Sequence, residues 1–390
     1  MKIKFAKKFT ALFIIFIITL VLSTCTLFLG PDPDDSPRGI FETVWNDFNR
    51  TYALFDHKGI NWNAIYNEYS PRITQDMTPV QLYIELHNML AELNDEHVGI
   101  GDGGFFDYMD ADNYWDDVTG EYYSRYGDEI GQYLNIIDRS NEDNFQPYYA
   151  HNFYLEDSVQ GNMSYGKFKS DFSQGYNIGY IHISDFWETS SIFLETGDWA
   201  KEIDSIISRF SNTDGLILDM RDNNGGMPSN YQHIASRFAA IEANYMTVRT
   251  KNGPGRNDFT APYTRTLKPE GTTYTKPVIM LTNNWTASCG EMFTLALRSQ
   301  PHVTHAGTNT RGIISIRILR PLINGWGYTV SVQQTADMAG ICHEAKKVFD
   351  ANTGIPPKVS ILTDYIWSNN YTELEDAQLE GALDLLINKF

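Results

Sequence analysis

The second half of the chain alternates between short, mainly apolar runs and helical patterns, and this alternation limits the folds that it can adopt. The runs lie at residues 178–183, 215–219 and 278–281, and helical patterns follow at 199–210 and 290–299. Apolar runs of this length indicate buried strands. Strands separated by helices form βαβ units in a mainly parallel sheet. The sequence therefore predicts an α/β fold, closed by an amphipathic helix at 373–389.

Earlier in the chain, apolar residues recur at helical spacing, as at Phe41, Val44 and Phe48. This pattern predicts a small helical unit before the sheet. The residues that follow it are rich in Tyr, Asp, Asn and Gly, which favours loops and short strands. We therefore divide the folded chain into an N-terminal helical unit at 39–100, a connecting region at 101–170 and a core at 171–390.

The N-terminus has the pattern of an export signal. Four lysines lie within the first eight residues, and residues 9–30 carry no charge. Residues 22–25 (Leu-Ser-Thr-Cys) resemble a bacterial lipoprotein cleavage box, so we expect a signal peptide at 1–25 with lipidation at Cys25. The proline-rich segment at 26–38 would then be an extended tether. An uncleaved transmembrane anchor is the alternative, and both place the body outside the cytoplasm, at the cell envelope.

Charge and histidine patterns exclude several classes of function. The formal net charge is −19, and no Lys/Arg cluster follows residue 8, so a nucleic-acid partner is not expected. The nine histidines form no His-Glu-x-x-His pattern, and the acidic residues 110–117 lack the glycine and terminal glutamate of a calcium loop. We therefore expect no metal and no cofactor. Beyond Cys25, only Cys289 and Cys342 remain, which is too few for a disulfide framework.

Two strands run directly into polar turns. Residues 221–226 (Arg-Asp-Asn-Asn-Gly-Gly) follow the second apolar run, and residues 286–291 (Thr-Ala-Ser-Cys-Gly-Glu) follow the third. Ser288 lies where free backbone N–H groups and the helix dipole favour negative charge, which suits an acyl-transfer nucleophile. A helix N-cap is the commoner use of such a serine. Two turns that supply N–H donors around one oxygen favour the nucleophile.

These two segments, in this order, resemble the tricorn-core and C-terminal-processing serine peptidase family. Three later segments, 306–312, 353–359 and 376–383, are similar to the family's next loop, late motif and terminal helix, although Lys358 stands where Asp is usual. Trp62 and residues 93–97 resemble its tricorn-type front end. The resemblance covers most of the chain from residue 39 and implies a ClpP/crotonase-like core.

The resemblance also implies roles for individual residues. Ser288 would be the nucleophile, and the Gly225/Gly226 turn and the Cys289 amide would form the oxyanion hole. One branch of the family uses a lysine base, but Ile313 occupies that position here, and an alkyl side chain accepts no proton. Neighbouring Arg311 cannot replace the lysine, because its guanidinium stays charged.

The other branch of the family uses a histidine, and His97 matches its position. Imidazole titrates near neutrality, so it can take the serine proton and return it. His97 could otherwise cap a helix C-terminus. An acidic residue should orient the ring: Asp350 fits best in type and position, with Asn352 and Glu344 as alternatives.

Other acidic residues near the predicted site remain ambiguous. Glu96 adjoins His97, and Glu291 lies one helical turn past Ser288; both are either functional or ordinary helix-end charges. No PDZ signature occurs in residues 101–177, so no PDZ domain is expected.

The sequence thus predicts an exported, membrane-anchored serine peptidase that hydrolyses peptides or unfolded proteins through a Ser288 acyl-enzyme, with His97 as base. The alternative is a non-catalytic surface lipoprotein that binds a peptide or ligand on the same fold. Departures from the family pattern at Asn224 and Lys358 motivate this alternative.

Overall fold

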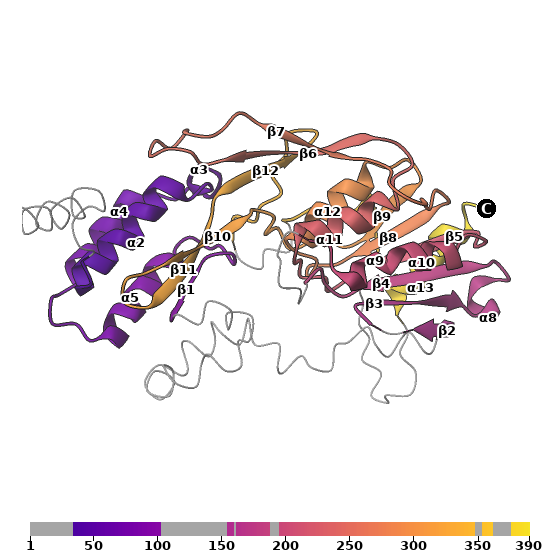
Figure 1. The fold of residues 1–390 in the computed structure, drawn as a ribbon, viewed down its shortest axis with the longest axis horizontal. Coiled ribbons are helices and arrows are strands. Elements are labelled where there is room, and N and C mark those ends of the chain that lie inside the picture. The colour runs from indigo at the N-terminus through magenta and orange to yellow at the C-terminus, as the bar shows by residue number, and fades with distance from the viewer. Residues whose placement is uncertain (1–33, 103–153, 160, 188–194, 348–352, 362–375) are drawn as a thin grey trace, which may run out of the picture.

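The computed structural model describes residues 34–102, 154–159, 161–187, 195–347, 353–361 and 376–390 (Figure 1). Three residues named above, Cys25, Asp350 and Asn352, lie outside these ranges, as do the predicted signal peptide and most of the connecting region. Among the helices formed by these described residues, none has the length and apolar character needed to cross a bilayer.

A seven-stranded sheet forms the C-terminal core, in the order β13-β9-β8-β5-β4-β3-β2. Neighbouring strands from β13 to β4 are parallel, whereas β3 and β2 join antiparallel. The mainly parallel sheet is therefore confirmed. The predicted strands at 178–183, 215–219 and 278–281 are β4, β5 and β8, the last one residue longer. The strands are β2 Leu155–Val159, β3 Met163–Phe168, β4 Ile178–Ile183, β5 Gly215–Asp219, β8 Val278–Thr282, β9 Val303–Gly307 and β13 Val359–Ser360.

Helices cover both faces of this sheet (Figure 1). In β5, Leu216 and Leu218 face one layer and Ile217 the other, because alternate strand residues point to opposite faces. One layer holds α9 Asp198–Lys201, α10 Ile203–Arg209, α11 Pro228–Ser236 and α12 Cys289–Arg298; the other holds α13 Ala377–Ile387, and α8 Ser170–Ser173 lies after β3. The helix predicted at 199–210 is thus split into α9 and α10, and that at 290–299 is α12.

The N-terminal helical unit has its own core around the fully buried Trp62 and Phe48. Its first helix begins two residues before the expected start, because Pro37 fits the first turn and the Ser36 side chain accepts a hydrogen bond from Gly39 N. The elements are α2 Pro37–Thr51, α3 Phe55–Lys58, α4 Trp62–Tyr69, η1 Ser70–Arg72 and α5 Pro79–Ala91.

Two three-stranded antiparallel sheets connect this unit to the core, and the sequence did not predict them. In one, β1 pairs with β11 and packs on the helical unit; in the other, the β6–β7 hairpin runs from the helical unit to the core (Figure 1). The strands are β1 Gly99–Asp102, β10 Arg317–Pro321, β11 Trp326–Ser331, β6 Ala243–Thr250, β7 Tyr263–Leu267 and β12 Gln333–Asp337.

Candidate active site

The two polar turns lie side by side at one edge of the large sheet. They follow β5 and β8, which are adjacent and parallel, so their carboxyl ends meet. Asp222 N donates to Asn283 Oδ1 at 3.0 Å, and Asn283 Nδ2 donates to Asp222 Oδ1 at 2.8 Å. Ala287 N adds a bond of 2.8 Å to the Asn223 carbonyl. The turn after β5 is therefore fixed against the turn that presents Ser288.

Ser288 has an unusual backbone conformation. Its φ is 52° and its ψ −118°, although it precedes helix α12 in the N-cap position, where an extended conformation is typical. Non-glycine residues at positive φ are uncommon and cluster at functional sites. A Cβ at Gly225 would lie 2.7 Å from the Ser288 Cβ and 3.0 Å from the Cys289 nitrogen. Only glycine therefore lets the two turns approach this closely.

The backbone amides around Ser288 differ in what they bind. Gly225 N already donates to Asn223 Oδ1 at 3.0 Å. The Gly225 carbonyl accepts from Phe186 N at 2.6 Å, which turns the Gly226 N–H of the same peptide in the opposite direction. Among the described residues, the Gly226 and Cys289 amides have no acceptor. Of the three predicted oxyanion donors, the Gly226 and Cys289 amides are therefore free among the described residues. Gly225 N is not free, but the missing side chain of Gly225 lets the two turns approach each other.

Glu291 connects the nucleophile to the loop at residues 310–315. Its side chain is fully buried and accepts from Ser288 N at 3.1 Å. The same carboxyl group accepts from Thr310 Oγ1, Gly312 N and Ile313 N at 2.6, 2.8 and 2.9 Å. Burial raises the pKa of Glu291 to about 7, against these hydrogen bonds. Glu291 is therefore buried beside Ser288 rather than exposed as a helix-end charge.

His97 comes to the same loop from the helical unit. Its side chain is buried, and burial lowers its pKa to about 4, so the ring is neutral near pH 7. The ring is hydrogen-bonded to the Ser315 backbone, and Nδ1 has no partner in the part of the chain that the structure describes. Asp95 Oδ1 accepts from His97 N at 2.9 Å and holds the turn in which the histidine lies.

Glu96 and Arg311 join the histidine segment to the nucleophile turn. Arg311 Nε donates to Glu96 Oε2 at 2.6 Å, and both side chains are largely buried. Arg311 N also donates to the Thr286 carbonyl at 2.9 Å, and its guanidinium lies 4.3 Å from the centre of the Trp285 ring. Ser288 and His97 are thus both connected to the loop at residues 310–315, one through Glu291 and the other through Ser315.

Of the candidate acids, Glu344 lies within the described residues. Its Oε2 accepts from Ile314 N and Ser315 N at 3.1 and 2.9 Å, and its Oε1 is buried without a partner in the described chain. Burial raises the pKa of Glu344 well above its usual range, and the nearby charges of Asp95 and Glu291 add to this rise. Glu344 therefore interacts electrostatically with both the histidine segment, through Asp95, and the nucleophile turn, through Glu291.

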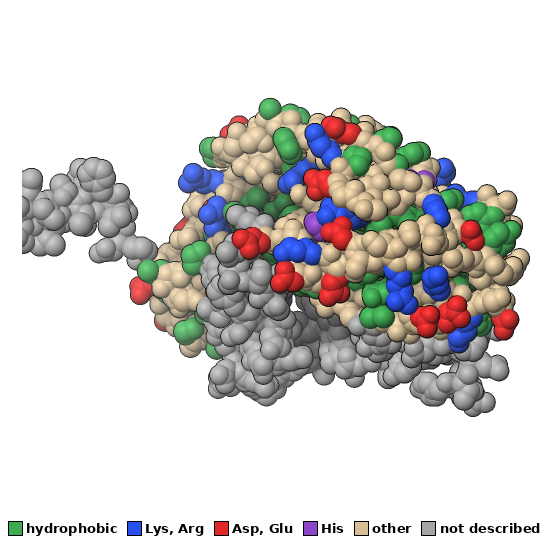
Figure 2. Space-filling model, turned by 45° about the vertical axis from the view of Figure 1, so that its right-hand side comes forward, with side chains coloured by type: hydrophobic (Ala, Val, Ile, Leu, Met, Phe, Trp, Pro, Cys, Tyr) green, Lys and Arg blue, Asp and Glu red, His purple; other side chains and the backbone are tan. Residues whose placement is uncertain are grey.

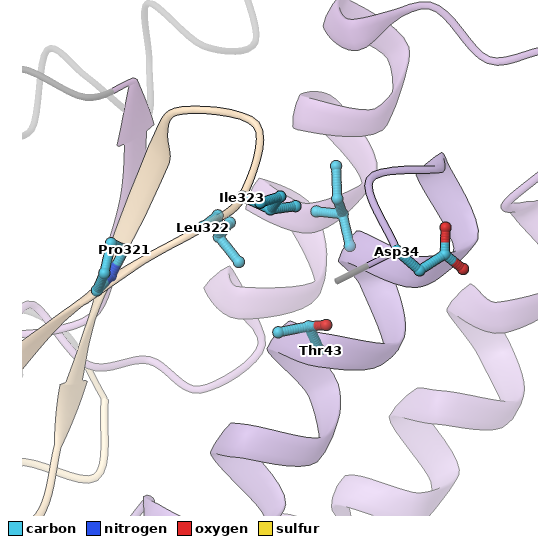
Figure 3. Close-up of a pocket in the computed structure, with 6 residues that line it drawn as sticks. Asp34, Thr43, Pro321, Leu322 and Ile323 are labelled. Carbon is cyan, nitrogen blue, oxygen red and sulfur yellow. The ribbon is translucent and has the colours of Figure 1, made fainter. Parts of the chain in front are cut away.

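Neither a metal centre nor a cavity accounts for these residues. The described residues contain no group of three or more His, Cys, Asp or Glu that could hold a metal. A hollow of about 350 Å³ lies between α2 and the β10–β11 hairpin (Figure 3), and none of the predicted site residues lines it. Its lining is Asp34, Ile40, Thr43, Pro321, Leu322 and Ile323.

Comparison with known proteins agrees with this geometry. The model of peptidase family S41 matches residues 177–361, which include the large sheet and Ser288, and that of the tricorn protease C1 domain matches residues 33–93. Residues 177–361 form a peptidase family S41 domain. With the C1 match the chain is tricorn-like, as the resemblance of its front end implied.

Individual S41 relatives extend the match. A carboxyl-terminal-processing protease of Synechocystis sp. is 28% identical over 217 residues, which are 55% of this chain and 45% of the relative. The chain thus spans less than half the length of this curated relative. A solved structure of a candidate peptidase from Parabacteroides merdae is 27% identical with a TM-score of 0.67, covering 92% of this chain and 98% of that one. A lipoprotein from Streptococcus agalactiae shares the fold, with 15% identity, a TM-score of 0.53 and the same coverage.

The sequence missed part of what surrounds this S41 site. The contacts of Glu291 with Ser288 N and with the loop at residues 310–313 were not predicted. The sequence carries a signal for the first of them, because a glutamate three residues after a helix-starting serine is typical of a capping box. The ion pair of Glu96 with Arg311 joins segments far apart in the chain, and no local pattern indicates it.

Proposed function

We propose that this S41 chain is an exported serine peptidase that hydrolyses peptides or unfolded proteins through an acyl-enzyme on Ser288. The observation that carries the proposal is the strained Ser288 at the start of α12, beside the free amides of Gly226 and Cys289. Such donors stabilise the oxyanion of a tetrahedral intermediate. The positive N-terminal end of the α12 dipole also stabilises this negative charge.

In the proposed mechanism, Ser288 Oγ attacks the scissile carbonyl while His97 takes its proton. The lowered pKa of His97 keeps the ring able to accept a proton down to about pH 4. The protonated ring then donates to the leaving amine, and a water molecule releases the acyl group by the reverse proton path. The hydrogen bond between His97 and Ser288 is expected to form with substrate bound, because catalytic contacts tighten in the Michaelis complex.

For the third member of the triad we favour Glu344 over Asp350 and Asn352. The support is its partner-free Oε1, close to the Ser315 backbone that binds the His97 ring, whose own Nδ1 has no partner among the described residues. A hydrogen bond between Glu344 Oε1 and His97 Nδ1 would satisfy both buried groups. The imidazolium that forms during catalysis would favour the ionised form of Glu344, and the carboxylate would in turn stabilise the imidazolium.

Cleavage of an unfolded, fluorescently labelled protein tests the proposal. Ser288→Ala and His97→Ala should each lower kcat by about a thousandfold or more, because nucleophile and base act as a unit. A fluorophosphonate probe should label the wild type at Ser288. Ser208→Ala and His233→Ala, on α10 and α11, are matched controls that should keep full activity. Full activity in Ser288→Ala would refute the proposal.

The identity of the acid is tested in the same assay. Glu344→Gln should lower kcat about a hundredfold, while Asp350→Asn and Asn352→Ala should stay within about threefold of the wild type. A larger loss in Asp350→Asn than in Glu344→Gln would assign the role of the acid to Asp350. Equal losses in the variants would indicate that each substitution disturbs the fold of this region rather than removing the acid.

We further propose that the body is anchored at the cell envelope through lipidated Cys25, with an uncleaved transmembrane segment as the alternative. The support is the uncharged run at residues 9–30 after four lysines. In cells fed a radioactive or alkyne-tagged fatty acid, the wild type should incorporate label and Cys25→Ala should not. An unlabelled wild type that stays in the membrane fraction would favour the uncleaved helix.

A non-catalytic, peptide-binding lipoprotein remains the second candidate. It is favoured by the His97 ring being bonded to Ser315 and by the family departures at Asn224 and Lys358. A wild-type chain that binds unfolded peptide but leaves Ser288 unlabelled by the fluorophosphonate would support it.

A further inference from the structure

His343 lies beside Glu344, and both of its ring nitrogens face hydrogen-bond acceptors. The side chain is buried, with Nδ1 3.1 Å from the Gly354 carbonyl and Nε2 2.9 Å from Asp337 Oδ2. A neutral imidazole carries only one N–H, and a carbonyl and a carboxylate have no proton to offer it. Both contacts are therefore satisfied only when the ring carries two protons and a positive charge.

The surroundings of Asp337 keep its side chain ionised. Its Oδ1 accepts from Ala339 N and Ile341 N, each at 2.9 Å. Burial acts to raise the pKa of Asp337, but the hydrogen bonds from Ile341 and His343 outweigh it and lower that pKa. A further charged side chain near Asp337 is Arg298 of α12, which interacts with Asp337 and donates to the Pro356 carbonyl at 3.3 Å.

The ring of His343 joins two segments that each contact the loop at residues 310–315. Ala345 N donates to the Gly312 carbonyl at 2.6 Å, directly after Glu344. On the other side of the ring, Gly354 precedes Ile355, whose N donates to Thr310 Oγ1 at 2.7 Å. The ring thus links the 343–345 segment to 354–355 where both segments contact this loop.

We propose that His343, held with both nitrogens protonated between Asp337 and Gly354, is the positioning residue that orients Glu344 toward His97. The inference rests on the proposed function, in which Glu344 is the acid of the triad. His343 touches neither substrate nor Ser288 in this scheme. It acts through the backbone of its neighbour, so it should affect kcat far more than KM.

Kinetics and nitrogen-15 NMR of the full-length chain test this inference. His343→Gln should lower kcat about tenfold, the loss expected from one charge-assisted hydrogen bond, and leave KM within twofold. Asp337→Asn should leave the His343 ring with a single proton, because an amide can donate to Nε2 of a neutral ring. In histidine-labelled wild-type protein at pH 7, the resonances lost in His343→Gln should show two protonated ring nitrogens.

Each outcome bears on the inference. A His343→Gln variant that is folded by circular dichroism and has wild-type kcat would overturn it, as would a singly protonated ring at pH 7. If His343→Gln fails to fold, an Asp337→Asn variant whose nitrogen-15 histidine spectrum at pH 7 is identical to that of the wild type overturns it. An inactive wild-type chain would overturn the proposed function and this inference together. An active wild type with a wild-type-like His343→Gln would overturn only this inference.

Discussion

Gly225 and Ser288 both have positive φ, and they face each other where the two turns meet. The sequence predicted a pair of turns and a serine between them, because apolar strands ended in polar, glycine-containing segments. It did not indicate which amides stay free. That depends on the Asn223 side chain, which takes the Gly225 N–H and leaves those of Gly226 and Cys289. Side-chain competition of this kind has no periodic signal in a sequence.

Gly225→Ala should abolish most of the activity. Its Cβ would lie 2.7 Å from the Ser288 Cβ, so the turn must move and displace the nucleophile. We expect at least a hundredfold loss of kcat/KM in the peptide-cleavage assay. Gly340→Ala is the matched control, because its φ is also positive, at 81°, but its Cβ would meet no atom within 4 Å. It should cost about 1 kcal/mol of stability and no activity. Equal losses in the two variants would contradict the steric explanation.

Glu291→Gln should change both activity and the pH dependence of stability. The folded pKa of about 7 is above the ordinary glutamate value of 4.5, so between these values the folded state holds a proton that the unfolded state releases. The free energy of unfolding therefore falls as pH rises through this window, and the glutamine variant should flatten that slope. We expect a loss of about tenfold in kcat, since an amide cannot accept from all four donors. Exposed Glu242→Gln is the control for urea titrations at pH 5, 6 and 7.

At the scale of helices and strands, β4, β5 and β8 were predictable because their residues are buried on both faces, which makes each strand a continuous apolar run. The strands of the two three-stranded sheets were not predictable. Strand β7 (Tyr-Thr-Arg-Thr-Leu) is mostly exposed or half-buried, and β1 pairs with β11 across most of the chain. The mixed polarity of β7 gives no periodic strand signal, and the partner of β1 is too far away in the sequence to be recognised from a local pattern.

Helix α13 is held to the sheet by a buried charge cluster. Arg221 donates to both Asp376 oxygens at 2.8 and 2.7 Å while also pairing with Asp219, and Asp376 caps the helix by accepting from Leu379 N. Asp376→Asn should cost about 3 kcal/mol of unfolding free energy, because it weakens a buried ion pair. Exposed Asp384→Asn on the same helix should cost less than about 0.5 kcal/mol. Similar urea midpoints for the two variants would contradict this role.

For the whole molecule, the site depends on how the N-terminal helical unit meets the sheet core. The two have separate hydrophobic clusters, and charged side chains of both signs are interspersed over the face shown in Figure 2. The sequence predicted both parts and the residues that each contributes, Ser288 from the core and His97 from the helical unit. It did not predict the contacts that align them, because these depend on tertiary packing.

Glu96→Gln should loosen this alignment. It removes the charge that Arg311 Nε meets at 2.6 Å and leaves a largely buried cation with a weaker partner. We expect a loss of about 3 kcal/mol in unfolding free energy and at least a tenfold loss in kcat. Exposed Glu92→Gln in the same segment is the control for both measurements. Unchanged kcat at normal stability would show that the pair does not align His97 with Ser288.

The pairing of β1 with β11 also orders events in time. The strand that continues from His97 finds its partner only at residues 326–331, after Ser288 has been made. A chain released only as far as residue 325 therefore contains Ser288 and His97 but lacks this strand pairing. If the two residues act together as proposed, such a partial chain should cleave no peptide.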